Sequence, residues 1–249
     1  MNSTSNLILP RTWEARSSLF RFDEPTHVYW LGEKKLPGIT GILQACRYVD
    51  TKWYTAEARN RGSHVHLGIK FLNKGTLDWT TVLDEYLGYI LAYQKLVRDW
   101  QIEVEYFERP MYHPELLFGG TPDIICRVLG GIPAIVELKT GPVMPWTALQ
   151  TIGQELLDRA WSPEPIRRRR WGVTLNADGT YTKPKEFKDY ERDEAVFRML
   201  NTVVQTLGKE KTTMVFDVLG SLNSDEREAL QELVPTLNSV VGHRELYAA

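Results

Sequence analysis

The sequence predicts an α+β fold, in which two helical segments are followed by a core strand and two strand pairs. Two segments, 52–73 and 80–100, carry apolar residues at helical spacing and are predicted to be helices. The apolar stripe of the second helix consists of Leu83, Leu87, Ile90, Leu91 and Leu96. A first core strand is predicted over 102–111, and two strand pairs follow it.

The clearest strand signal is a hairpin around Gly130 and Gly131, which two apolar runs flank. With a two-residue loop, Asp123 and Glu137 would project from opposite faces of the sheet. A three-residue loop that starts at Leu129, with a glycine in the left-handed conformation, sets Asp123 across from Glu137. The two runs are 121–129 and 132–139.

The distribution of side chains favours the three-residue loop. It gathers Asp123, Glu137 and Lys139 on one face and leaves the other face wholly apolar, as a core requires. The apolar face consists of Pro122, Ile124, Cys126, Val128, Ala134, Val136 and Leu138.

These three polar residues suit metal-dependent hydrolysis of a phosphodiester. Two carboxylates near one point bind a hard divalent cation such as Mg²⁺, which lowers the pKa of a bound water and offsets phosphate charge. A neighbouring ammonium group can orient the nucleophile or stabilise the transition state. Asp123, Glu137 and Lys139 also suit an ordinary solvated strand face, so their spacing alone leaves both interpretations open.

The sequence around these residues resembles the PD-(D/E)xK nuclease superfamily, and within it the RecB-like and lambda-exonuclease-like branch common in phage genomes. The matching segments are GSHVH at 62–66, GGTPD at 119–123, VELKTG at 136–141 and a glutamine-bearing helix after them. The resemblance implies a restriction-endonuclease-like core, a mixed central β-sheet flanked by helices, with an N-terminal hairpin and helical region.

One nuclease domain is expected over 1–249. The family-like region covers about 25–207, where a segment from Asp189 resembles the helix that closes the family domain. A C-terminal helical extension is expected over 208–249, with Asn223 and Ser224 placed to cap a helix over 225–233. Packing, a partner contact or an oligomer interface would each explain this extension.

The resemblance implies a role for each matched residue of the hairpin. Asp123 and Glu137 would bind the metal, and the Leu138 carbonyl would be a backbone ligand. Lys139 would be the catalytic lysine. The expected cofactor is Mg²⁺ or Mn²⁺.

A histidine upstream joins the metal shell in several members of the branch, and His66 matches it. Neutral imidazole suits Mn²⁺ better than Mg²⁺. His64 is the rival, because it lies two residues away and points in a different direction on a helix.

Two further polar residues match the branch. Gln150 matches a glutamine that contacts the site or the substrate phosphate, whereas Gln154 stands where many relatives carry a tyrosine, and its role is left open. Glu108 matches an acidic residue that supports a second metal or holds a water. Its nearby competitors are Glu103, Glu105 and Glu115.

Near the N-terminus, His27 and Tyr29 resemble the H-x-Y opening of these phage nucleases, with Gly38 in place of a usual serine. The residues around Gly32 predict a small hairpin, and Thr40 is placed to cap the helix that follows. The hairpin strands are expected over 28–31 and 35–39. No catalytic role follows from this segment.

The second strand pair, 167–175 and 181–187, flanks Asp178 and Gly179, which favour a tight turn between antiparallel strands. The pair is expected to extend the sheet at one edge. The run from Arg167 to Arg170 suits either contact with DNA phosphates or ordinary solvated surface.

Composition limits the function in three ways. A net charge of -2 gives no global attraction for DNA, so any DNA path must be a local basic patch. Cys46 and Cys126 are too few for the four-thiolate iron–sulfur cluster of some RecB-like nucleases, and they indicate a reducing compartment. Without a membrane span or a signal peptide in the sequence, we expect the cytoplasm of a bacterium or a phage-infected host.

The predicted function is that of a Mg²⁺- or Mn²⁺-dependent deoxyribonuclease, an exonuclease in phage or bacterial recombination, repair or DNA processing. DNA is the expected partner, joined by a recombination or single-strand-annealing protein, and no membrane is expected. A structure-selective endonuclease or junction resolvase and a non-cleaving DNA-binding relative are the alternatives. The sequence leaves open the strand polarity, the strand preference, the number of metals and the oligomeric state.

Overall fold

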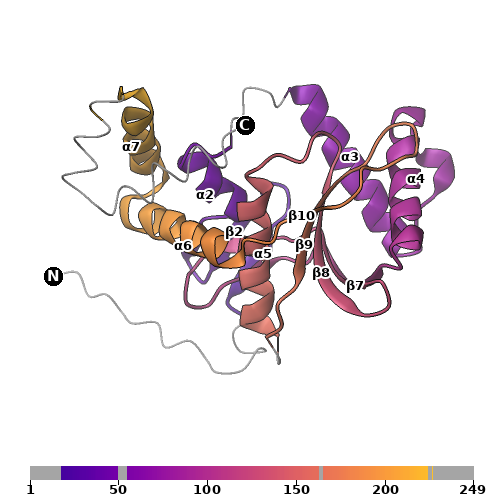
Figure 1. Ribbon diagram of the computed structural model, residues 1–249, viewed down its shortest axis with the longest axis horizontal. Helices are drawn as coiled ribbons and strands as arrows, with labels where there is room; N and C mark the ends of the chain where they lie inside the picture. Colours follow the sequence, from indigo (N-terminus) through magenta and orange to yellow (C-terminus); the bar gives the residue numbers. More distant parts are fainter. Residues whose placement is uncertain (1–17, 50–54, 163–164, 224–225, 227–249) are drawn as a thin grey trace.

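The computed structural model describes residues 18–49, 55–162, 165–223 and 226. At its centre lies a five-stranded sheet with the order β10-β9-β8-β7-β4 (Figure 1). Only the β8–β9 pair is parallel. The strands are β4 (Glu103–Phe107), β7 (Ile124–Val128), β8 (Ile132–Lys139), β9 (Arg169–Thr174) and β10 (Lys185–Glu186). The predicted α+β class, with a mixed central sheet flanked by helices, is confirmed.

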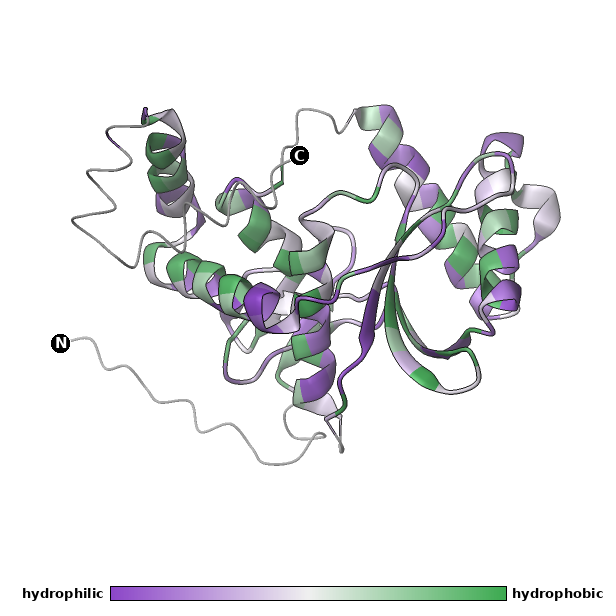
Figure 2. Ribbon diagram, in the orientation of Figure 1, coloured by the Kyte–Doolittle hydropathy of each residue, from purple (hydrophilic) through white to green (hydrophobic). Residues whose placement is uncertain are grey.

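Helices cover both faces of the sheet. The parallel step from β8 to β9 needs a crossover, which α5 (Thr147–Trp161) supplies. With α6 (Tyr190–Leu207), α5 packs over the face that carries Ile125 and Ile135. The opposite face packs against α3 (Ala56–Asn73) and α4 (Asp84–Asp99). Figure 2 shows hydrophobic residues along the hairpin strands and on the helices that pack against them.

The β7–β8 hairpin has the predicted register. Val128 pairs with Ile132, which leaves a three-residue loop, and Ile124 pairs with Val136. The three loop residues all adopt positive φ angles, of 50° at Leu129, 76° at Gly130 and 131° at Gly131. One residue further along this register, Asp123 lies opposite Glu137.

The two helices on the α3–α4 side differ from the prediction at their starts. Helix α3 begins at Ala56, capped by the Thr55 hydroxyl, and residues 52–54 of the predicted segment lie outside the described residues. Helix α4 begins at Asp84, because a separate 3-10 turn occupies Trp79–Thr81. The predicted apolar stripe is wrong at Leu83 and Leu91, which are 57% and 42% exposed. The buried face is rotated onto Ile90, Ala92, Tyr93 and Leu96.

The N-terminal segment forms a separate three-stranded sheet. The predicted hairpin around Gly32 is confirmed as β2 (Val28–Leu31) and β3 (Lys34–Leu36), but β3 ends three residues earlier than predicted, because a helix begins at Ile39. Strand β1 (Phe20–Asp23) was not predicted. The predicted cap at Thr40 is wrong. Helix α2 (Ile39–Ala45) begins two residues earlier than that cap implies, since Gly38 forms a β-bridge with Gly119 and takes the N-cap position without a side-chain bond.

The strand predicted over 102–111 is divided between two sheets. After β4, Glu108 adopts a φ of 44°, which ends the extended strand. Pro110 follows and lacks a backbone donor. The chain then enters β5 (Met111–Tyr112), which pairs with β6 (Gly119–Gly120).

The arginine run does not form the uniform surface expected of it. The side chains of Arg167 and Arg169 are 46% and 42% exposed, whereas Arg168 and Arg170 are buried. Arg170 donates to Asp193 at 2.7 Å. Arg168 donates to Asp158 at 2.6 Å and to Glu105 at 2.7 Å. The prediction of DNA contact or solvated surface is therefore wrong for these two arginines, because alternate positions of an extended chain point inwards.

The helical extension predicted after residue 207 begins with α7 (Lys209–Ser221), whose Phe216 enters the core on the α5–α6 side. Beyond it, Asn223 and Glu226 exchange the two hydrogen bonds of a helix N-terminus, at 2.9 and 3.0 Å. The rest of the helix predicted over 225–233 lies outside the described residues. Within the described ranges, no helix is both long and apolar enough to cross a bilayer.

The buried Arg170–Asp193 pair yields a stability prediction. Asp193→Ala should lower the free energy of unfolding by about 3–5 kcal/mol, since it leaves a guanidinium group buried without its partner. Asp189→Ala is the control, because Asp189 pairs with Arg192 at the surface and should cost at most about 1 kcal/mol. Urea unfolding measures both values, and equal losses would contradict the structural role of Arg170.

Candidate active site

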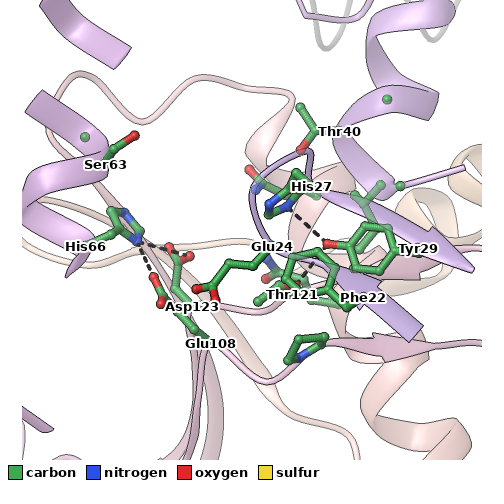
Figure 3. A pocket seen from close by; sticks show the side chains of 18 of the residues that line it. Phe22, Glu24, His27, Tyr29, Thr40, Ser63, His66, Glu108, Thr121 and Asp123 are labelled. Atoms are coloured by element: carbon green, nitrogen blue, oxygen red, sulfur yellow. Dashed lines mark hydrogen bonds and ion pairs between the residues drawn. The ribbon is translucent and has the colours of Figure 1, made fainter. Parts of the chain in front are cut away.

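A pocket of about 940 Å³ lies between helix α3, the N-terminal sheet, helix α2 and the start of helix α5. Four predicted site residues from separate parts of the chain line it, namely His66, Glu108, Asp123 and Gln150. Figure 3 shows His66, Glu108 and Asp123 pointing toward one another at one side of the pocket. Glu137 and Lys139 join this group through hydrogen bonds with Gln150.

Asp123 is fixed at the start of the hairpin. Its Oδ2 accepts a hydrogen bond from the Leu138 backbone N–H at 2.8 Å, which ties it to the neighbouring strand. Its Oδ1 lies 3.6 Å from Nδ1 of His66. Its backbone carbonyl accepts from the Glu108 N–H at 3.0 Å, so Glu108 is held beside it.

Glu137 is almost fully buried and accepts three hydrogen bonds. Its Oε1 accepts from Lys139 Nζ and from Gln150 Nε2, both at 2.7 Å, and its Oε2 accepts from Gln154 Nε2 at 2.6 Å. Gln154, whose role the sequence left open, therefore orients Glu137. Gln150 and Gln154 lie four residues apart on one face of α5, and this spacing was the available signal.

Lys139 is held at the end of β8 by two groups besides Glu137. Its ammonium group donates to Gln150 Oε1 at 3.0 Å and lies 5.0 Å from the centre of the Trp146 ring. Trp146 was not predicted as part of the site. A cation over an indole face is attracted to it, so Trp146 limits the positions that Lys139 can take.

The structure brings His66, and not His64, to the site. His66 Nδ1 lies 3.2 Å from Glu108 Oε1, in addition to its contact with Asp123. The His64 ring instead stacks on Tyr86 and bonds the Asn60 carbonyl at 2.8 Å.

Glu108 is the acidic residue that reaches the pocket. Its competitors lie elsewhere: Glu103 and Glu115 are exposed, and Glu105 pairs with Arg127 and Arg168. Lys70, which sequence reasoning missed, approaches Glu108 at 3.7 Å. It lies one helical turn after His66, so the spacing of four residues could have identified it.

The charges of the site are strongly coupled. Burial raises the pKa of Asp123 to about 7, and the negative charge of Glu137 adds to this rise. Burial alone would lower the pKa of His66, but the carboxylates of Asp123, Glu108 and Glu137 together raise it to about 9. The site thus concentrates negative charge that a cation would offset.

The donor set suits Mg²⁺ or Mn²⁺ in its chemistry, because it offers carboxylate oxygens and one imidazole nitrogen. Over the part of the chain that the structure describes, no group of three or more His, Cys, Asp or Glu side chains is arranged to hold a metal ion. Glu137 is engaged by its three donors, which leaves an open site. Such a site fits Mg²⁺, which typically uses one or two carboxylates and keeps several waters. The ligand role of the Leu138 carbonyl stays a prediction.

Comparison with known proteins finds a likeness among solved structures. No protein-family model matches the sequence, and no curated protein matches it. The chain is similar to an alkaline exonuclease. This protein, LHK-Exo from Laribacter hongkongensis, is 18% identical over 68% of this chain and 93% of its own, with a TM-score of 0.29. Its complex with dAMP gives 16% identity over 72% and 94%, with a TM-score of 0.30. The function proposed below rests on the geometry of the site.

The placement of the two histidines yields a prediction about metal use. His66→Ala should raise the Mn²⁺ concentration needed for half-saturation of the site by about tenfold in a calorimetric titration, as expected when one ligand or its orienting contact is lost. His64→Ala is the matched control on the same helix and should leave that concentration unchanged. A larger shift in His64→Ala would reverse the assignment.

Proposed function

We propose that this protein is a divalent-metal-dependent nuclease that hydrolyses phosphodiester bonds in DNA. The observation that carries the proposal is that His66, Glu108 and Asp123, from segments far apart in the sequence, meet at one pocket. Glu137 and Lys139 join them through Gln150, which also lines the pocket. Buried carboxylates, a lysine and an imidazole in this arrangement suit metal-assisted attack of water on a phosphate.

Asp123, Glu108 and His66 would hold the cation, and Glu137, which accepts three hydrogen bonds, would contribute a remaining oxygen lone pair from the α5 side. Bound Mg²⁺ or Mn²⁺ supplies a lowered pKa for an attacking water and compensates charge on the phosphate. Lys139, fixed by Glu137 and Gln150, orients that water or stabilises the added negative charge. Gln154 keeps Glu137 in place.

Within this proposal, the protein is an exonuclease of phage or bacterial recombination, repair or DNA processing, in keeping with the sequence resemblance. The test is incubation of the protein with end-labelled linear duplex, its single-stranded counterpart and a covalently closed circle, each with Mg²⁺, Mn²⁺ or EDTA. Metal-dependent loss of linear DNA with the circle spared is expected. Cleavage of the circle would indicate an endonuclease instead, and no cleavage in either metal would indicate a protein that binds DNA without cutting it.

Lys139→Ala tests the role of the lysine. We expect at least about a hundredfold loss of cleavage rate, since the ammonium group acts on the reacting atoms, while Mn²⁺ binding is kept. Lys185→Ala is a matched control, because Lys185 lies on strand β10, outside the pocket lining, and should retain the parental rate. A Lys139→Ala enzyme that cleaves as fast as the parent would reject the proposed role.

A further inference from the structure

Helix α7 contributes a lysine to the far end of the pocket. Lys209, the first residue of α7, lines the pocket together with Thr40, Gly41 and Gln44 of helix α2. Figure 3 shows Thr40 on the other side of the pocket from His66. Glu108 and Asp123, which form the acidic group of the site, thus line the same cavity as Lys209.

The ammonium group of Lys209 lies close to the backbone of α2. A Cβ atom at position 41 would lie 2.4 Å from Lys209 Nζ, so an alanine there would require the end of this side chain to shift. Gly208, with a φ of 78°, makes the turn that places Lys209 at the start of α7.

Several contacts hold α7 against α2. Arg47 donates two hydrogen bonds to Asp217, both at 2.7 Å, and the Thr213 hydroxyl donates to the Ala45 carbonyl at 3.2 Å. Phe216 is 2% exposed in the core beneath them. These contacts fix the position of the helix to which Lys209 belongs.

The two lysines that line the pocket differ in their partners. Lys70 Nζ lies 2.6 Å from Glu24 Oε1. Lys209 makes no hydrogen bond or ion pair with any residue that the structure describes. Lys209 as a whole is exposed, but partial desolvation of its ammonium group lowers its pKa, and the positive charge of Lys35 adds to this effect. A bound anion would stabilise the charged form of Lys209 against both desolvation and repulsion by Lys35.

Two neutral donors lie next to this ammonium group. Thr40 and Gln44 are four residues apart on α2, so their side chains share one helix face, and both line the pocket. Neither side chain has a hydrogen-bond partner within the described ranges. A hydroxyl, an amide and an ammonium group together suit the oxygens of a phosphate.

We propose that Lys209, assisted by Thr40 and Gln44, binds a backbone phosphate of the DNA strand that occupies the pocket, so that the C-terminal extension completes the substrate site. This inference rests on the proposed function, because it assumes that the strand reaches the acidic group in the same cavity. The extension is then part of the binding surface as well as of the core.

The test measures DNA affinity separately from cleavage. Binding of a fluorescent single-stranded oligonucleotide would be measured by anisotropy against NaCl concentration, in Lys139→Ala protein with Mn²⁺. Adding Lys209→Met should weaken binding at least about tenfold and reduce the slope of log K against log salt by about 0.7, the value for one phosphate contact with a single strand. Lys209→Arg should restore most of the affinity.

Two further variants control for general charge and for folding. Lys211→Met removes an exposed lysine of the same helix that does not line the pocket, and should leave affinity and slope unchanged. Gly41→Ala keeps the charge but makes the end of the Lys209 side chain shift, and should weaken binding by less than Lys209→Met does.

The possible outcomes separate the two proposals. Parental affinity and slope in Lys209→Met, or an equal loss in Lys211→Met, would overturn the role of Lys209 even in a protein that cleaves DNA. A wild-type protein that binds DNA through Lys209 but never cleaves it would refute the nuclease proposal alone.

Discussion

The register of the β7–β8 hairpin is the constraint on which the site depends. Because side chains alternate along a strand, a slip of one residue would turn Asp123 toward the apolar layer under α3 and α4 and away from Glu137. The three-residue loop with positive φ angles fixes the register at one end. At the other end, the bond from the Leu138 N–H to Asp123 fixes the carboxylate itself.

The remaining site residues are placed by elements packed on that hairpin. Helix α5 brings Gln150 and Gln154 onto Glu137, and helix α3 brings His66 and Lys70 to the side of Asp123. Both helices are fixed by the two apolar faces of the sheet. Burial of the carboxylates is unfavourable, and hydrogen bonds from Gln150 and Gln154 and the positive charge of Lys139 offset it at Glu137. A divalent ion would contribute most on the open side of the site.

Local pattern in the sequence was enough to predict the hairpin, its loop length and the placement of Asp123 opposite Glu137, whereas His66 and Glu108 were identified only by the family resemblance. Predictions from local pattern were wrong where contacts between distant parts of the chain determine the structure. Thr40 lost its capping position because Gly38 bridges Gly119, a residue 81 positions away in the sequence. The arginine run was predicted to lie at the surface, but Arg168 and Arg170 are buried against acidic partners from β4, α5 and α6. Lys209 carries no local signal, since only the docking of α7 on α2 takes it to the pocket.

The claim that the acidic group holds a divalent cation is tested most directly by calorimetric titration of Mn²⁺ into the protein without DNA. The structure predicts at least one bound Mn²⁺ per wild-type chain, loss of that binding in Asp123→Ala, and retention in Glu103→Ala, which removes an exposed carboxylate outside the pocket. Absence of Mn²⁺ binding to the wild type, or equal binding to all three proteins, would contradict a metal site at Asp123.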